Sequence, residues 1–366
     1  MALEKKDIVI WLSHIEGIGN RDIKCLINYF HNNIEEVWYA GRKHIVNALG
    51  GKEELANKIM ENRDEQFFIK ISKALKDNNI FPLTIYDSAY PSKLKNIYDP
   101  PYTIFIKGNK IEFDMPLISI VGTRRATPYG KWAAHRFAKE LAEWGVGVIS
   151  GLALGVDTCG HRGALEGNGY TIGVLGCGLD QYYPASNRAL MDKIFERGCV
   201  ISEYCLGTPP LKYHFPARNR IVSGLSDGVI VIEAPEKSGA LITADFALDQ
   251  GKDIYALPGN INNIQSRGVN KLIRDGARIL LEIDDIIENL KYRYSMHKTN
   301  TEQLAKNDLS ELETQVFNIV KRNPINIDLI INETGIKASE LNPILTILEI
   351  KGYINQMPGK IFTAAR

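Results

Sequence analysis

Residues 117–163 read LISIVGTRRATPYGKWAAHRFAKELAEWGVGVISGLALGVDTCGHRG. An apolar run over residues 117–121 ends at Gly122, and the polar loop after it leads to Thr127 and Pro128. Threonine suits the N-cap of a helix and proline suits its first turn, where a missing N–H costs little. Apolar side chains then recur with helical spacing at Ala133, Ala134, Phe137, Ala138, Leu141 and Ala142. This half of the stretch predicts a strand, a loop and a helix with one face to lay on a sheet.

The second half repeats the pattern, with a strand at residues 147–150, a glycine-bearing loop at residues 151–155 and a helix that starts near Asp157, whose carboxylate should orient the loop. Both loops should lie at the carboxyl ends of neighbouring parallel strands. In open α/β sheets that edge binds ligands, and helix N-termini there favour anions such as phosphate. The first loop brings Arg124 and Arg125 to this edge. The stretch therefore predicts an anion-binding edge of a sheet.

The overall composition is that of an ordinary globular protein. The chain has 366 residues, of which 45% are hydrophobic and 24% charged, and its net charge is +1. Because there is no global basic field, a nucleic-acid site would have to come from local clustering. The five cysteines include no C-x-x-C pair, which argues against a zinc site and suits a reducing compartment. No apolar run has the length of a membrane span and the first residues do not resemble a signal peptide, so we expect a cytoplasmic chain without cofactor or metal.

Short apolar runs alternate with helical segments between residues 115 and 290. Beyond the two strands above, strands are expected at residues 170–175, 200–203, 229–233, 253–257 and 278–281. Near-continuous apolar runs are typical of parallel strands buried on both faces. A helix is expected at residues 186–197, capped by Ser186. The pattern predicts an α/β fold with a Rossmann-like, doubly wound parallel sheet.

The chain is expected to divide into a helical domain (1–70), an extended lead-in that packs on the sheet (71–114), the Rossmann-like domain (115–290), a linker (291–307) and a winged helix-turn-helix domain (308–366). The G-I-G sequence at residues 17–19 resembles a helix-hairpin-helix (SAM-like) turn, which either holds a DNA phosphate or is only structural. The last domain carries six Lys+Arg against seven Asp+Glu. That balance favours a partner-binding or weak DNA role over sequence-specific readout.

Enzymatic interpretations of this sheet lack the residues they need. A dinucleotide site would have G-x-G-x-x-G after the first strand and an acidic residue at the end of the second, whereas residues 122–124 are GTR and residues 150–151 are SG. A phosphate-loop NTPase would have Ser or Thr after Gly-Lys, but residues 130–132 are GKW. His161 and Ser238 have neither triad partners nor metal-ligand spacing around them. The residues therefore do not predict an enzyme.

The segment LKYHFPARNR at residues 211–220 follows the fourth strand and so reaches the same edge. It interleaves phosphate or base donors with rings, at Lys212, Tyr213, His214, Phe215, Arg218, Asn219 and Arg220. Proteins grip single strands in this way, because cations track the backbone while bases stack on rings. Two structural alternatives stay open. Arg124 and Arg125 could form ion pairs with Asp157 or Glu203, and one of the two arginines of the segment could be structural.

Several motifs, in order along one sheet, resemble the DNA-processing protein A (DprA/Smf) family. They are V-G-T-R at residues 121–124, Y-G at 129–130, S-G-L-A-L-G-V-D at 150–157, Y-P at 183–184 with Asn187, F-P-A-R-N-R-I at 215–221, S-G-A-L-I-T-A at 238–244 and P-G at 258–259. The resemblance is dense from residue 81 to residue 290. It extends to both ends of the chain, because the family often has a helical N-terminal domain and a winged helix at the C-terminus.

This resemblance implies a non-enzymatic protein that binds single-stranded DNA, protects incoming DNA during natural transformation and helps to load the RecA recombinase, displacing single-strand-binding protein. It also implies a homodimer formed through the Rossmann-like domain. Carried over by motif, Arg124 and Lys212 would contact phosphates and Phe215 would stack on a base, with Arg218 and Asn219 in the same pocket. The expected DNA-contact set is completed by Gly122, Arg125, Gly151 and Arg220.

Two other functions remain alternatives. A LOG-type nucleotide phosphoribohydrolase shares a glycine-rich carboxyl edge, but it needs a P-G-G-x-G-T-x-x-E motif, and residues 235–244 read PEKSGALITA without that glutamate in register. A nucleotide-sensing adaptor would bind a small nucleotide on the sheet and a protein on the winged helix.

Overall fold

The computed structural model describes residues 3–109, 111–296, 309–321, 325–351, 353–357 and 360–364. The chain forms two compact units, Met1–Lys298 and Thr299–Arg366. Most of the expected linker, residues 297–307, lies outside the described residues. No helix within the described ranges combines the length and apolarity that crossing a bilayer requires.

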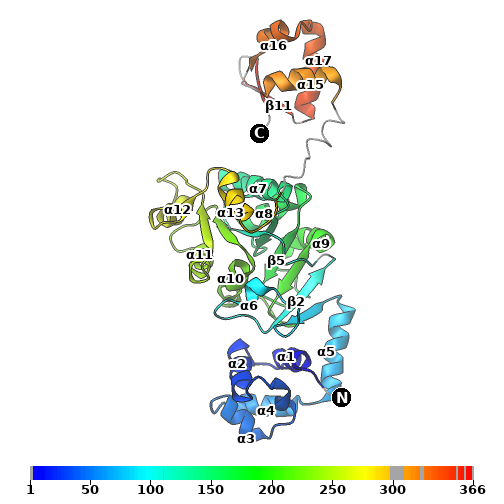
Figure 1. Ribbon diagram of the computed structural model, residues 1–366, viewed down its shortest axis with the longest axis vertical. Helices are drawn as coiled ribbons and strands as arrows, with labels where there is room; N and C mark the ends of the chain where they lie inside the picture. Colours follow the sequence, from blue (N-terminus) through cyan, green and yellow to red (C-terminus); the bar gives the residue numbers. More distant parts are fainter. Residues whose placement is uncertain are drawn as a thin grey trace. The chain divides into compact units, whose positions relative to one another are not determined.

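A nine-stranded sheet in the order β1-β2-β6-β5-β4-β3-β7-β8-β9 organises the first unit (Figure 1). Its strands are β1 Phe81–Thr84, β2 Thr103–Gly108, β3 Leu117–Val121, β4 Gly147–Ser150, β5 Thr171–Leu175, β6 Cys199–Ser202, β7 Gly228–Val231, β8 Asp253–Ala256 and β9 Arg278–Ile279. From β6 to β9 all neighbours pair in parallel, whereas β1 and β2 add an antiparallel edge. Because β3 pairs with both β4 and β7, the strand order reverses between β3 and β7. A ligand crevice is expected at such a switch point.

Helices cover both faces of the sheet. Alternate side chains of β3 belong to two different layers. Ile118 and Ile120 lie in the core covered by α7 Pro128–Glu143, α8 Val156–Glu166 and α13 Asp284–Lys291. Leu117 and Val121 face the core under α10 His214–Leu225, α11 Gly239–Asp249, α12 Ile264–Arg274 and the short α6 Ser92–Lys95. Successive residues of a strand point to opposite faces, so an all-apolar strand must be covered twice. The expected doubly wound α/β fold is confirmed.

The N-terminal helices are α1 Lys5–Ser13, α2 Asn20–Tyr29, the 3₁₀ helix η1 Ile34–Trp38, α3 Arg42–Ala48, α4 Glu53–Glu61 and α5 Glu65–Asp77. They enclose a core of their own around Trp11, which is fully buried. Helix α5 continues past residue 70, so the first part of the segment expected to be extended is helical.

The expected cap at Ser186 is wrong. Residues Ala185–Asn187 form a 3₁₀ turn, η2, and α9 Arg188–Arg197 begins after it. Asn187 stands at the N-cap position, but its side chain donates instead to Leu152 O (2.9 Å) and Thr158 Oγ1 (2.9 Å). The amide therefore ties this turn to the loop after β4, a long-range role that local spacing could not reveal.

The second unit has the winged-helix arrangement. Its elements are α15 Glu311–Val320, β10 Ile325–Asn326, α16 Ile327–Thr334, α17 Ala338–Ile350, β11 Ile354–Met357 and β12 Ile361–Ala364. The strands form an antiparallel sheet in the order β10-β12-β11, and the helices share one apolar core with it. Ser310 caps α15 by accepting a hydrogen bond from the Glu313 amide, while Glu313 accepts one from the Ser310 amide.

Candidate nucleic-acid interface

A cavity of about 750 Å³ opens at the carboxyl edge of the sheet, at the switch point between β3 and β7. We call it the trough. Its lining comes from four parts of the chain. These are Gly122, Arg124 and Arg125 after β3; Gly151 and Asp157 after β4; Lys212 just before α10 with Phe215, Arg218 and Asn219 in it; and Lys237 and Ser238 after β7 with Thr243 in α11. The structure thus brings together all the expected contact residues except Arg220.

Glu233 holds the loop after β3 in place. The sequence analysis did not predict a role for this residue. This buried residue accepts hydrogen bonds from the Thr127 amide (2.8 Å) and the Thr127 hydroxyl (2.6 Å). The same hydroxyl accepts from the Gly130 amide at 3.1 Å, so the expected cap of α7 is confirmed. The arginine-bearing loop is therefore held at both ends, because the Thr123 amide also donates to the Glu233 carbonyl at 2.7 Å. The only sequence signal was an acidic residue placed at a strand end.

Arg124 and Phe215 form the rim of the trough. The exposed Arg124 guanidinium lies 5.5 Å from the centre of the Phe215 ring. The Phe215 ring also stacks on Tyr183, with centroids 5.2 Å apart and planes inclined by 25°. Phe215 is half-buried, so part of its surface stays open. The sequence analysis named Tyr183 only as part of the Y-P motif of the family resemblance, and it did not predict this stacking.

Arg124 and Arg125 have no ion-pair partner among the described residues, and the alternative in which they pair with Asp157 or Glu203 is wrong. Glu203 instead binds a different arginine, Arg220. Lys212 is also exposed and lines the trough. Together with the exposed Lys237, these side chains face the solvent at this edge, and none of them forms an ion pair within the described residues, although the whole chain carries a net charge of only +1.

Arg218 forms the floor of the trough. It is 5% exposed, and its Nη1 donates to the carbonyls of Gly151 (2.7 Å) and Val174. Burial lowers the pKa of this guanidinium, and the nearby Asp157 opposes that effect. A Cβ at Gly151 would collide with the guanidinium, which explains the glycine there. Asn219 bridges the floor to α11, since it accepts from Arg218 Nε (3.2 Å) and donates to the Gly239 carbonyl (3.1 Å).

Asp157 orients the glycine loop, as its position suggested. Its Oδ2 accepts hydrogen bonds from the amides of Gly151 (3.1 Å) and Ala153 (3.3 Å). Burial raises the pKa of Asp157 to about 6, although Arg218 and these amides act to lower it. His161 lies one turn further along α8, where burial lowers its pKa to about 3. Its Nδ1 is 2.7 Å from the Thr171 hydroxyl, so this neutral ring supports the strand instead of binding an anion.

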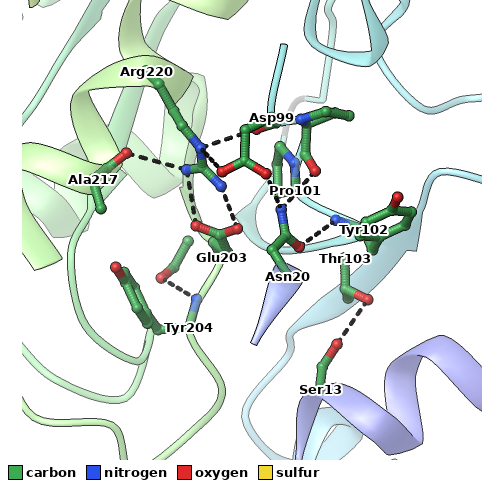
Figure 2. A network of polar contacts seen from close by, with 12 residues as sticks. Ser13, Asn20, Asp99, Pro101, Tyr102, Thr103, Glu203, Tyr204, Ala217 and Arg220 are labelled. Atoms are coloured by element: carbon green, nitrogen blue, oxygen red, sulfur yellow. Dashed lines mark hydrogen bonds and ion pairs between the residues drawn. The ribbon is translucent and has the colours of Figure 1, made fainter. Parts of the chain in front are cut away.

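Arg220 does not line the trough, so the structure corrects its expected place. Figure 2 shows its guanidinium between Glu203 and Asp99. It donates to the Glu203 carboxylate at 2.5 and 2.9 Å and to the Asp99 carboxylate at 3.2 Å. It also donates to the carbonyls of Asp99 and Ala217. With its side chain 8% exposed, Arg220 braces α10 against the chain before β2. The structural alternative is thus confirmed for this arginine.

This bracing reaches the N-terminal helices. Asn20, the first residue of α2, donates to the Pro100 carbonyl at 2.7 Å and accepts from the Tyr102 amide at 3.1 Å, next to Asp99 (Figure 2). Ser13 adds a hydrogen bond to Thr103 at 3.2 Å. The helical segment and α10 are therefore connected through one short stretch of chain.

His214, expected among the stacking rings, is buried. Its Nδ1 lies 3.1 Å from the Gly176 carbonyl, and its ring stacks on Tyr204 with centroids 4.0 Å apart. Tyr213 is exposed but does not line the trough. Only Phe215 of this aromatic run therefore faces the cavity. Within the described ranges, no group of three or more His, Cys, Asp or Glu residues is placed to hold a metal ion.

Comparison with known proteins identifies the family. Residues 81–291 match the model of the DNA recombination-mediator protein A family, and residues 300–360 match the DprA winged helix domain. The DNA processing protein DprA of Bacillus subtilis is 40% identical over 66% of this chain and 83% of its own length. Protein Smf of Synechocystis is 31% identical over 95% of this chain and 96% of its own.

Solved structures agree. DprA from Streptococcus pneumoniae superposes with a TM-score of 0.70 at 34% identity, covering 81% of this chain and all of that one. DprA from Helicobacter pylori, whose single-stranded DNA binding mode has been described, gives a TM-score of 0.53 at 35% identity over 58% of this chain and 97% of that one. Sequence motifs, sheet order and winged helix point the same way, and the chain belongs to the DNA recombination-mediator protein A (DprA/Smf) family.

Proposed function

We propose that this protein binds single-stranded DNA in the trough, protects DNA that enters the cell during natural transformation, and helps to load RecA onto it. The observation that carries the proposal is that Arg124, Lys212 and Phe215, which come from separate parts of the chain, line one cavity. Two cations without an ion pair in the described part of the chain, beside a half-buried ring, suit a DNA strand whose phosphates need charge and whose bases need a stacking surface.

The neighbouring carboxylates support binding over catalysis. Glu233 is committed to Thr127, and Asp157 to the amides of the glycine loop. A phosphoribohydrolase would need a carboxylate that is free to assist cleavage of the glycosidic bond, and Glu236 of the loop after β7 is exposed and outside the trough lining. We therefore assign the protein a non-enzymatic role. The family and the H. pylori relative favour the same choice.

Filter binding tests this directly. Labelled single-stranded oligonucleotides, a duplex of the same sequence and a labelled mononucleotide are each titrated with the protein. We expect tight, length-dependent retention of single strands that weakens as salt rises, because counterions are released from the phosphates. Retention of the mononucleotide alone would support the nucleotide-sensing adaptor, and release of free base from it would support the phosphoribohydrolase.

The finer steps of the proposal need separate assays. Protection is measured as survival of a single strand against an exonuclease. RecA loading is measured as strand exchange on DNA already coated with single-strand-binding protein, with and without this protein. We further propose that the protein works in the cytoplasm as a homodimer, and light scattering measures that mass. The five free cysteines suit a reducing compartment.

The two flanking segments receive supporting roles. The G-I-G turn lies between α1 and α2, and its Gly17 has a positive φ of 90°, which a residue with a side chain rarely adopts. Contact of this turn with DNA stays a prediction. The near-neutral winged helix is proposed to bind a protein partner in preference to a specific DNA sequence, because its charges offer little attraction to phosphates.

A further inference from the structure

The start of α7 carries two large rings that no part of the described chain covers. Tyr129 is 47% exposed and Trp132 is 54% exposed. The two rings stack on each other, with centroids 6.0 Å apart and planes inclined by 28°. They lie three residues apart on one helix face. Side chains of this size usually bury most of their surface, so an exposed pair that, within the described chain, stacks only on itself indicates a binding surface.

One cation contacts the pair, and two more are close to it in the sequence. The Arg136 guanidinium lies 5.4 Å from the centre of the Trp132 ring, one turn further along the same face. Lys131 is exposed and has no ion pair among the described residues, and Arg125 is exposed just before the helix. Residues 124–136 contain no acidic residue. Positive charge and the N-terminal end of the helix dipole therefore coincide with the two rings.

Acidic groups that pack near this face are already engaged. Glu140 accepts from Arg136 Nε at 2.7 Å. Glu166 of α8 binds Lys139 (2.8 Å) and His135 (2.8 Å), further along α7. Glu233 is buried beneath Thr127. Each of these three carboxylates thus already has a partner of its own.

The rings follow the trough-lining arginines closely in the chain. Arg125 lines the trough and precedes Tyr129 by four residues, so the two sites are at most about 14 Å apart along the chain. Tyr129 also reaches the end of β8, where its hydroxyl lies 3.5 Å from the Pro258 carbonyl. A DNA single strand that leaves the trough past Arg124 and Arg125 would reach the rings of Tyr129 and Trp132 next. Cations alternating with stackable rings are the pattern by which proteins hold single strands without reading sequence.

We propose that Tyr129, Trp132 and Arg136 form a second platform for single-stranded DNA, which binds nucleotides that extend beyond the trough. This inference rests on the proposed function, because it uses the trough as the first part of the track. It goes beyond that function by assigning bases to the outer face of α7. The platform contributes only when a strand is long enough to occupy both places.

A length series tests the platform. Fluorescence anisotropy gives the affinity of labelled oligothymidylates from about 4 to about 24 nucleotides for wild type, Trp132→Ala, Trp132→Phe and Phe215→Ala. Trp132→Ala should weaken long oligomers by about five- to tenfold and leave the shortest ones unchanged, since one stacked base is lost. Trp132→Phe keeps a ring and should bind nearly as wild type. Phe215→Ala should weaken every length.

Tryptophan emission gives a second readout. Trp11 is fully buried, and Trp38 and Trp144 are half-buried, so Trp132 is the most exposed of the four indoles. Long oligomers should quench wild-type emission, and the quench should be largely absent in Trp132→Phe although that variant still binds. The matched control Trp144→Phe should keep the quench.

Three outcomes separate the possibilities. Equal binding of wild type and Trp132→Ala at all lengths, with Phe215→Ala impaired, overturns the platform and leaves the proposed function intact. A change of mass in light scattering for Trp132→Ala, without a length-dependent loss of affinity, overturns it too and marks the rings as a contact between copies of the chain. Absence of binding to any single strand by the wild type removes the proposed function itself.

Discussion

The Arg124 guanidinium lies 5.5 Å from the centre of the Phe215 ring, so a residue from the loop after β3 and one from the start of α10 form a single surface. Tyr183 stacks on the same ring from a third loop. If Arg124 binds a phosphate and Phe215 stacks on a base, as proposed, this contact makes the contributions of the two residues to DNA affinity depend on each other.

The first prediction concerns this pair. Phe215→Ala should weaken binding of single-stranded DNA by about 1–3 kcal/mol and leave its salt dependence unchanged, because stacking releases no counterion. Arg124→Ala should lower the slope of log K against log salt by about 0.7, as one phosphate contact is lost. The double variant should show a coupling of about 0.5–1 kcal/mol from the lost cation–π contact. Purely additive losses would mean that the contact does not persist in the complex.

The second prediction concerns Lys212. Lys212→Ala should weaken all single-stranded oligonucleotides alike, whatever their sequence, because a lysine contributes a point charge to the backbone. Its side chain is exposed, so the unfolding free energy should change by less than about 0.5 kcal/mol. Lys76→Ala, at the exposed end of α5, serves as the control and should bind as wild type. A sequence-dependent loss at Lys212 would place this residue on a base.

The third prediction concerns the Arg220–Glu203 ion pair, whose side chains are 8% and 16% exposed. Glu203→Ala should lower the unfolding free energy by about 3–5 kcal/mol, because it leaves a buried guanidinium without its main partner. The exposed pair of Arg42 and Glu53, 48% and 69% exposed, is the matched comparison, and Glu53→Ala should cost less than about 1 kcal/mol. Denaturant unfolding measures both. Equal effects would show that burial does not govern the Arg220 pair.

The fourth prediction concerns Asp157, whose pKa rises from 3.8 to about 6 on burial. The folded state therefore holds this proton more tightly than the unfolded state does. The resulting stability is fully present below pH 3.8 and is lost as the pH rises through about 6. Relative to Asp157→Asn, the wild type should lose about 3 kcal/mol of unfolding free energy over that window, measured by denaturant titration. A constant difference across the window would contradict a raised pKa.

The same carboxylate should couple DNA binding to pH. Asp157 lines the trough, and a phosphate bound beside it would disfavour its ionised form. Affinity for single strands should therefore rise as the pH falls through about 6, and this rise should be smaller in Asp157→Asn. Binding isotherms at several pH values, at fixed ionic strength, supply the measurement.

The fifth prediction concerns His161, whose effect on stability has the opposite pH dependence to that of Asp157. Its pKa falls from 6.5 to about 3, because burial disfavours the charged ring. The stability it contributes is present above pH 6.5 and is lost as the pH falls through about 3. His161→Gln should remove that acid sensitivity. A variant as acid-sensitive as the wild type would assign the loss to other groups.

Much of the fold could be read from local pattern. The apolar runs at residues 117–121 and 147–150 are strands, and the Thr127 cap and Pro128 begin α7 as expected. The start of α9 could not be read in this way. Ser186 has the chemistry of a cap, but Asn187 is drawn to Leu152 and Thr158 across the fold. Hydrogen bonds that satisfy buried polar groups across the fold outweigh the local preference of a serine for the helix N-cap.

The sequence by itself determined the fold class, the glycine-rich loops at one edge of the sheet and the residue types available there, because period, caps and turn residues act over a few neighbours. Only the tertiary structure decided which arginine lines the trough and which forms a buried ion pair. Arg218 and Arg220 are two residues apart on α10, yet one forms the floor of the trough and the other braces Glu203 and Asp99. It also decided that Arg124 keeps its charge free, because the carboxylates that could have paired with it are held by other partners. Such outcomes depend on which distant groups meet and which of them water can still reach, and no local pattern records that.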